Sequence, residues 1–237
     1  MKENATITSA LENRILSQEN QSIDLNEWIF NQLKIEQGDE ILELCCGTGA
    51  QTAYFNKFID SGSLTCIDVN KNSIDKAKLH VDHSRAEFII SEIDNTQNYI
   101  KKNFDIIFSA YGFYYSNNAE LLHKELKSSL NKNGRFILVG PTIGNNKQLY
   151  DLIVKLGCQI PNEVLDSSES FMLRFMEIFL KNYREVKIIK TINQIHYDDH
   201  ESLLSYWKNT TFYNPGLDEE FISLSKKYFS NDIIINK

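Results

Sequence analysis

Proline is scarce in this sequence and glycine is modest. Its 237 residues include three prolines and ten glycines, so we expect no long disordered linker between separate domains. No apolar run approaches the ~20 residues that a membrane-spanning helix requires. The opening residues, MKENATITSALENRIL, lack the apolar core of a signal peptide. We therefore expect a cytoplasmic protein without a membrane partner.

Positive charge is also scarce. Lys and Arg number 25 against 32 Asp and Glu, which gives a net charge of −7, and the basic residues form no long block. A protein that neutralises many phosphates presents a basic face. The composition therefore argues against a nucleic-acid partner.

The cysteines lack the spacing of a metal or redox site. The chain has Cys45, Cys46, Cys66 and Cys158, without a C-x-x-C pair and without a His at zinc-like spacing from them. A disulfide between adjacent cysteines would strain the intervening peptide. We expect no metal, and interpret these residues as free thiols that act as small apolar side chains in a reducing compartment.

Short apolar segments alternate with helical ones along the first 140 residues. Strands are expected at 40–44, 63–68, 86–90, 104–110 and 135–140. Helices are expected at 24–35, 50–59, 72–81 and 120–130. This alternation predicts right-handed βαβ crossovers and a parallel sheet covered on both faces by helices.

The rhythm changes after Pro141. Helices are expected at 146–157, 162–182, 201–207 and 218–229, and two further strands at 185–192 and 193–197. The segment 141–183 is too long for a plain crossover. We interpret it as a helical insertion or lid over the sheet edge, because ligands of such sheets bind outside the carboxyl ends of the strands.

Glycines follow the first strand in the stretch ELCCGTGAQT. Gly47 and Gly49 form a turn that lets backbone N–H groups approach a ligand closely. Asp68, at the end of the second strand, can accept both hydroxyl hydrogens of a ribose. Thr52 stands where a dinucleotide fingerprint has its third glycine, and a carboxylate at Glu43 would repel a pyrophosphate. The pattern predicts a nucleoside cofactor that carries a positive amine or sulfonium.

EILELCCGTGAQT resembles motif I of the class I S-adenosylmethionine-dependent methyltransferases, D/E-x-G-x-G-x-G. Glu43, Gly47 and Gly49 match this motif, while Cys45 stands where the family has its first glycine. This departure places the local φ angle of Cys45 in question. We expect its side chain to pack towards the sheet and to leave the loop backbone in place.

Later segments resemble the second, third and fourth motifs of the same family. The resemblance implies that Asp68 and Val69 hold the ribose, and that Glu92 and Ile93 hold the adenine. It also implies that residues after the fourth strand line the methionine and the substrate. The implied cofactor contacts are Glu43, Cys45, Gly47, Gly49, Asp68, Val69, Glu92, Ile93, Ser109 and Ala110.

Aromatic residues gather in the segment YGFYY that follows the fourth strand. Tyr111, Phe113 and Tyr114 are candidates to contact the substrate or the sulfonium through their rings, although ordinary packing explains them equally well. Tyr206 and Trp207 are further substrate candidates on a lid, with core packing as the alternative.

Catalysis has two candidate residues, Tyr115 and His196. Tyr115 sits near a position where some relatives carry a His, and His196 could act as a general base. His80, His83 and His123 are expected on exposed helix faces and receive no role.

The family fold is α/β and Rossmann-like, with a seven-stranded, mostly parallel sheet, helices on both faces and the helical insertion after strand 5. A single domain would then span residues 1–237. Its parts would be an N-terminal helical cap at 1–37, a cofactor-binding core at 38–140, a lid at 141–183, and the final strand pair with C-terminal helices at 184–237.

The resemblance implies transfer of the methyl group of S-adenosyl-L-methionine to an O, N or C atom of a small molecule, leaving S-adenosyl-L-homocysteine. The fourth motif reads Ser109-Ala110-Tyr111-Gly112, which argues against the D/N-P-P-Y/F chemistry of base methylation. A methyltransferase acting on RNA or protein and a cofactor-binding module without catalysis remain open. The sequence does not indicate the acceptor or the oligomeric state.

Overall fold

The computed structural model describes residues 8–82, 84–229 and 232–237. The chain divides into two compact units. The sheet unit is Asn26–Gly140, and the split unit combines Met1–Leu25 with Pro141–Lys237. The chain crosses between the units next to Pro141, where the sequence predicts a change of rhythm. The predicted arrangement of a single domain with a lid stays a prediction.

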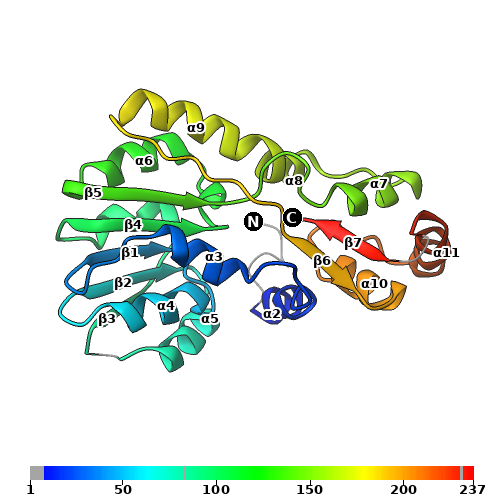
Figure 1. Ribbon diagram of the computed structural model, residues 1–237, viewed down its shortest axis with the longest axis horizontal. Helices are drawn as coiled ribbons and strands as arrows, with labels where there is room; N and C mark the ends of the chain where they lie inside the picture. The colour runs from blue at the N-terminus through cyan, green and yellow to red at the C-terminus, as the bar shows by residue number, and fades with distance from the viewer. Residues whose placement is uncertain (1–7, 83, 230–231) are drawn as a thin grey trace. The chain divides into compact units, whose positions relative to one another are not determined.

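The sheet unit is built on five parallel strands in the order β3-β2-β1-β4-β5 (Figure 1). The strands are β1 (Glu40–Leu44), β2 (Ser63–Asp68), β3 (Ala86–Ile90), β4 (Phe104–Ala110) and β5 (Leu130–Val139). The first four match the predicted segments. β5 begins earlier than predicted, because Leu130 pairs with Phe104 before a register shift.

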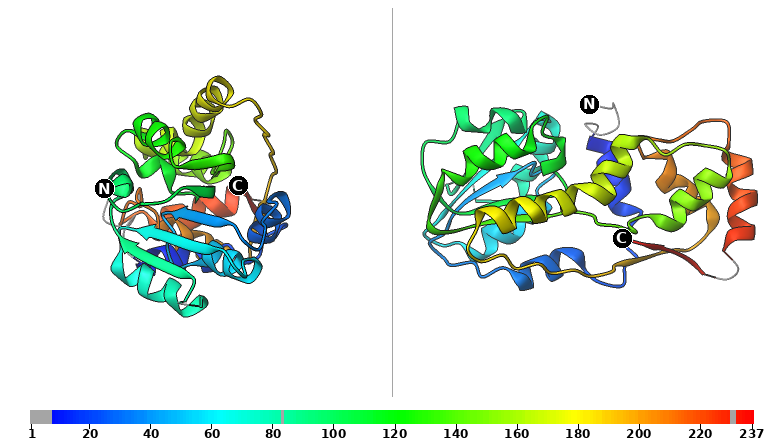
Figure 2. Two further views of the ribbon diagram at one scale, coloured as in Figure 1. Left: turned by 90° about the vertical axis from the view of Figure 1, so that its left-hand side faces the viewer. Right: turned by 90° about the horizontal axis from the view of Figure 1, so that it is seen from above.

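Helices connect these strands. They are α3 (Leu25–Gln32), α4 (Ala50–Phe58), α5 (Lys71–Ala77) and α6 (Ala119–Lys127), with short 3₁₀ turns η1 (Lys78–His80), η2 (Ile93–Asn98) and η3 (Phe113–Tyr115). The strand order runs outward in opposite directions from β1 and β4. Right-handed crossovers therefore place α4 and α5 on one face and α6 on the other (Figure 2).

Aromatic contacts hold α3 and α4 to the sheet. Phe55 of α4 meets Phe108 of β4 edge-on with ring centroids 5.1 Å apart. Phe30 of α3 stacks on Tyr54 at 4.7 Å and contacts Phe55 at 4.9 Å. These contacts join α3, from Asn26 onward, to the sheet unit, and the N-terminal cap at 1–37 stays a prediction.

The split unit is mostly helical. Its helices are α2 (Thr8–Leu16), α7 (Lys147–Lys155), α8 (Asn162–Leu165), α9 (Phe171–Asn182), α10 (His200–Lys208) and α11 (Asp218–Tyr228), and η4 (Asp166–Ser170) is a π-helical turn. Its strands β6 (Gln194–Tyr197) and β7 (Ile233–Asn236) pair antiparallel. None of the helices in the described part of the chain is long and apolar enough to cross a membrane.

The predicted seven-stranded sheet is wrong in its count. The described residues form a five-stranded sheet and a separate two-stranded one. Residues 185–192, predicted as a strand, form none, and Ile188, Ile189 and Ile192 are exposed. A strand needs a partner edge for its backbone groups, and β6 pairs instead with β7 from much further along the chain.

Candidate functional site

The carboxyl ends of β1 and β4 meet at the point where the strand order reverses. Leu44 of β1 lies opposite Ser109 of β4. The loop 45–49 and the loop 111–116 therefore leave neighbouring strands at one edge of the sheet. In open α/β sheets this reversal point forms the ligand-binding crevice.

The glycines of the loop after β1 are required by its backbone and by its packing. Gly47 and Gly49 have φ angles of 55° and 89°, a region that side chains rarely adopt. A Cβ on Gly49 would also lie 2.7 Å from Cα of Ala77 in α5. Gly49 is the N-cap of α4 and provides no side-chain cap, so backbone N–H groups dominate the start of this helix.

Asp68 reaches this glycine loop directly. Its Oδ2 accepts the N–H of Gly47 at 2.9 Å, and its Oδ1 accepts the N–H of Asn70 at 2.8 Å. Burial raises the pKa of Asp68, against the effect of these hydrogen bonds. Each carboxylate oxygen keeps a second lone pair. The residues present therefore fit a ligand with two hydroxyl groups, such as a ribose.

Glu43 lies inside the sheet unit, with 2% of its surface exposed. It accepts a hydrogen bond from the Thr52 hydroxyl at 2.6 Å and one from the Cys66 thiol at 3.8 Å. Burial raises the pKa of Glu43 to about 8. The side chain therefore joins β1 to α4 and is largely protonated at neutral pH, which differs from the charged carboxylate that the sequence suggested.

Cys45 occupies a glycine-like conformation, with a φ angle of 56°. Its Sγ lies 3.6 Å from the carbonyl oxygen of Gly112. The expectation that Cys45 packs towards the sheet is wrong, because its side chain reaches the loop that follows β4. Cys46 and Cys66 are buried free thiols, as expected.

The second and third motif positions Val69, Glu92 and Ile93 differ in their exposure. Glu92 is exposed and Val69 is 39% exposed, whereas Ile93 is buried. Asp94, which sequence reasoning missed, accepts hydrogen bonds from the Ser116 hydroxyl and from the backbone N–H of Asn117. Its position two residues after Glu92 gave no signal of this contact, because the partners come from the loop after β4.

The fourth motif positions divide between core and surface. Ser109 is buried and donates its hydroxyl to the Leu44 carbonyl at 3.2 Å, while Ala110 ends β4 half-buried. Phe113 is 2% exposed and packs edge-on against Phe136 at 5.6 Å. Core packing is therefore the interpretation that the geometry favours for Ser109 and Phe113.

The other aromatics of the loop differ in exposure. Tyr111 and Tyr115 are each 38% exposed, and Tyr114 contacts Tyr115 with centroids 4.9 Å apart. Tyr111 has a φ angle of 54° and donates its N–H to the Val139 carbonyl. Tyr111 and Tyr115 therefore keep side-chain surface that a ligand can contact.

The remaining candidates belong to the split unit. His196 lies half-buried in β6, and its backbone N–H donates a hydrogen bond to the Asn20 carbonyl at 2.8 Å. Trp207 is fully buried and stacks on Phe221 at 4.8 Å. The hydroxyl of the buried Tyr206 accepts a hydrogen bond from the Lys237 ammonium. Tyr206 and Trp207 therefore form part of the core of the split unit, which was the alternative interpretation.

His123 is buried, contrary to expectation. Its ring lies 5.2 Å from that of Phe136, and burial lowers its pKa to about 4. His83 lies outside the described residues. Among the residues that the structure describes, no group of three His, Cys, Asp or Glu side chains is placed to hold a metal ion.

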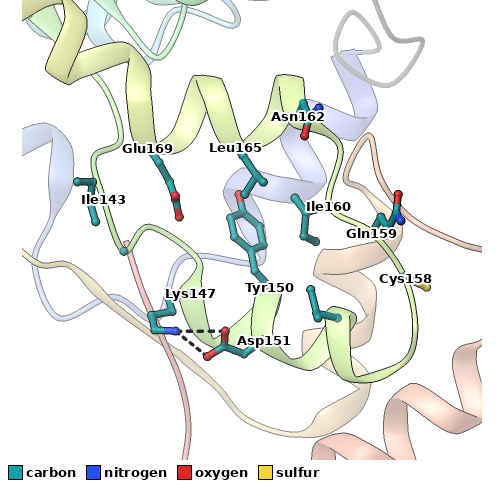
Figure 3. A pocket seen from close by; sticks show the side chains of 12 residues that line it. Ile143, Lys147, Tyr150, Asp151, Cys158, Gln159, Ile160, Asn162, Leu165 and Glu169 are labelled. Carbon is teal, nitrogen blue, oxygen red and sulfur yellow. Dashed lines mark hydrogen bonds and ion pairs between the residues drawn. The ribbon is translucent and has the colours of Figure 1, made fainter.

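An open pocket of about 610 Å³ lies within the split unit (Figure 3). Tyr150 of α7 reaches toward Leu165 on the facing helix, and Lys147 pairs with Asp151 at 3.0 Å. The lining residues are Ile143, Gly144, Lys147, Tyr150, Asp151, Val154, Cys158, Gln159, Ile160, Asn162, Leu165 and Glu169. None of the predicted site residues lines this pocket.

The chain is similar in sequence to proteins that are named as methyltransferases. Residues 41–134 match a family described as "Methyltransferase domain". The chain is 31% identical over 142 residues to the demethylmenaquinone methyltransferase of Lactobacillus johnsonii, covering 56% of this chain and 55% of that protein. It is 29% identical over 120 residues to the malonyl-[acyl-carrier protein] O-methyltransferase of Priestia megaterium, covering 49% and 42%. The chain thus spans about half the length of these curated relatives.

Solved structures share the fold. The YcgJ protein of Bacillus subtilis gives a TM-score of 0.60 at 13% identity, covering 89% of this chain and 93% of that one. A methyltransferase from Thiobacillus denitrificans, in complex with S-adenosyl-L-homocysteine, gives 0.56 at 15% identity, covering 95% of both chains. At such low identity these likenesses establish the fold alone.

Proposed function

We propose that this protein transfers the methyl group of S-adenosyl-L-methionine to a small molecule, as the match of residues 41–134 to a methyltransferase-domain family supports. The observation that carries the proposal is the hydrogen bond between Asp68 and the N–H of Gly47. It unites the ribose-type carboxylate at the end of β2 with the glycine loop at the end of β1. Neither feature alone is specific to a nucleoside cofactor.

Bound S-adenosyl-L-methionine supplies an electrophilic methyl group on a sulfonium, which a nucleophile displaces directly. In this chain the backbone at Gly47 and Gly49 would hold the cofactor closely, and Asp68 would accept hydrogen bonds from its ribose. Tyr111 and Tyr115 present exposed rings that favour a positive charge nearby. These residues bind and align the reactants, and alignment is the main contribution that a protein makes to such a displacement.

The proposal of a small-molecule acceptor has two supports. One curated relative is named for a small molecule, demethylmenaquinone. The net charge of −7 is also unfavourable for an RNA or DNA partner. Tyr115 and His196 stay the candidates for contact with the acceptor or for proton removal. The rates of methyl transfer by Tyr115→Phe and by His196→Ala test these roles.

Cofactor binding is measured by calorimetry with S-adenosyl-L-homocysteine. Asp68→Ala should weaken binding by about 10- to 100-fold, because it removes two charge-assisted hydrogen bonds to the ribose. Asp75→Ala removes a carboxylate from the exposed face of α5 and should bind as the wild type does. Absence of heat from the wild type, or an Asp68→Ala protein with unchanged affinity, contradicts the proposal.

The acceptor class is tested with methyl-labelled S-adenosyl-L-methionine and cell extract separated by size. Label in the low-molecular-weight fraction supports the proposal. Label in RNA or protein contradicts the small-molecule acceptor while keeping the methyltransferase activity. Tight binding without label in any fraction identifies a non-catalytic module.

A further inference from the structure

In the loop after β1, a cysteine occupies a backbone conformation that favours glycine. In the loop after β4, a glycine occupies a conformation that other residues also adopt. Cys45 has a φ angle of 56°, in the left-handed region that suits glycine. Gly112 has a φ angle of −129°, which side chains tolerate. Backbone conformation therefore explains neither the cysteine at 45 nor the glycine at 112.

The space between the two loops explains both residues. A Cβ on Gly112 would lie 2.3 Å from the Cβ of Cys45 and 2.9 Å from its Sγ. Such distances are far inside van der Waals contact, so a side chain at 112 and the one at 45 exclude each other. The thiol of Cys45 occupies this space and lies 3.6 Å from the Gly112 carbonyl oxygen.

This contact joins the two loops at the carboxyl edge of the sheet. Cys45 lies two residues before Gly47, which binds Asp68. Gly112 follows Tyr111, whose φ angle of 54° turns the chain and whose N–H is held by Val139. The far end of the same loop is held by Asp94 through Ser116 and Asn117. The aromatic loop, Tyr111–Tyr115, is thus anchored on both sides.

We propose that Cys45 and Gly112 form a steric pair that positions the aromatic loop against the glycine loop, residues 45–49, so that Cys45 is a positioning residue for methyl transfer. This inference rests on the proposed function for its role in catalysis. Cys45 acts through its size and place, since its thiol is half-buried beside a backbone carbonyl. Strained backbone at two facing positions, 45 and 111, is typical of sites where geometry must be held.

A double-mutant cycle tests the pair. The proteins are the wild type, Cys45→Gly, Gly112→Ala and the double variant, each measured for affinity for S-adenosyl-L-homocysteine and for hydrogen exchange of residues 111–116. Gly112→Ala should bind about 10-fold or more weakly and exchange faster, because one loop must move. Cys45→Gly, which empties the same space, should also bind more weakly and exchange faster, and the double variant should return to within about threefold of the wild type. The rescue arises because the Cys45→Gly substitution frees the space for the added methyl group.

Two controls separate position from chemistry. Cys45→Ser keeps the size of the side chain and should behave as the wild type, which excludes a role of the thiol itself. Gly38→Ala adds a methyl group in the same unit, where the nearest atom lies 3.5 Å away, and should leave affinity and exchange unchanged.

The outcomes are distinguishable. If the wild type does not bind S-adenosyl-L-homocysteine, the proposed function fails, and hydrogen exchange alone decides whether the pair positions the loop. Equal effects of Gly112→Ala in the wild-type and Cys45→Gly backgrounds would overturn the pair, as would a loss in Cys45→Ser. If Gly112→Ala does not fold, folding of the double variant supports the pair and its failure to fold overturns it. Changed stability with unchanged affinity and exchange reduces the contact to packing and overturns the positioning role.

Discussion

Glu43 is an ionisable side chain enclosed by apolar strands and held by two hydrogen bonds, from Thr52 and Cys66. Burial opposes its ionised form more than these hydrogen bonds favour it, which raises its pKa to about 8. A carboxyl group with a raised pKa binds its proton more tightly in the folded state than in the unfolded state. Its contribution to stability is therefore fully present below its ordinary pKa of 4.5 and is lost as the pH rises through about 8.

Glu43→Gln should remove this pH dependence, because glutamine keeps the shape and hydrogen bonds without ionising. Between pH 5 and pH 8, the free energy of unfolding of the wild type should fall relative to that of Glu43→Gln by about 1 kcal/mol per pH unit. Urea denaturation of both proteins at several pH values measures the difference. Glu87→Gln, on the exposed face of β3, is the control, and parallel curves for the wild type and Glu43→Gln would contradict the prediction.

At the scale of elements, two isoleucine-rich segments with similar sequences differ in whether they form a strand. EVKIIKTI (185–192) stays outside any sheet with its isoleucines exposed, whereas β7 pairs with β6 and buries Ile235 opposite Ile195. Strand propensity is alike in both segments, so the difference lies in the partner that each backbone finds.

Substitution of one isoleucine in each segment tests this difference. Ile235→Ala should lower the free energy of unfolding by about 3 kcal/mol, because it leaves a cavity in the core of the split unit. Ile192→Ala, at a position that is 65% exposed, should change it by less than about 0.5 kcal/mol. Chemical denaturation measures both, and comparable losses would mean that residues 185–192 are buried in a strand after all.

At the scale of the molecule, the split unit is assembled from segments at both ends of the sequence. Asn193, which is 3% exposed, forms hydrogen bonds with both of these segments. Its side chain donates to Gln21 at 2.8 Å and accepts from the N–H of Ile23 at 3.2 Å, while its backbone exchanges two hydrogen bonds with Lys237. The segment that precedes the sheet unit therefore lies beside β6, where Gln21 forms an antiparallel β-bridge with Ile195.

Asn193→Ala should destabilise the split unit by about 2 kcal/mol, since it removes two hydrogen bonds to half-buried groups of Gln21 and Ile23. Hydrogen exchange should rise at residues 20–23 and 194–197 and stay constant in β1 and β4. Gln194→Ala, which changes the exposed neighbouring side chain, should cost less than about 0.5 kcal/mol. Faster exchange throughout the sheet unit would contradict a role confined to the split unit.

The local sequence pattern was sufficient to predict the first four strands and the position of the glycine loop. The first four strands matched because each is a short apolar run bounded by turn residues, so its limits depend on nearby residues. Glu43, Gly47, Gly49 and Asp68 could be selected for the same reason, since a glycine turn and a strand-end carboxylate are local features. The sequence alone thus determined the βα alternation and located the glycine loop and the strand-end carboxylate that the structure joins.

Contacts between distant residues decided the rest. β6 took its partner from β7 rather than from residues 185–192, His123 entered the core against Phe136, and Asp94 met the loop after β4. The pairing of Cys45 with Gly112 is of the same kind, because a glycine with an ordinary φ angle signals nothing until the side chain that fills its space is known. Burial, the pKa of Glu43 and the anchoring of the aromatic loop all follow from which segments pack together, and only the tertiary structure fixes that.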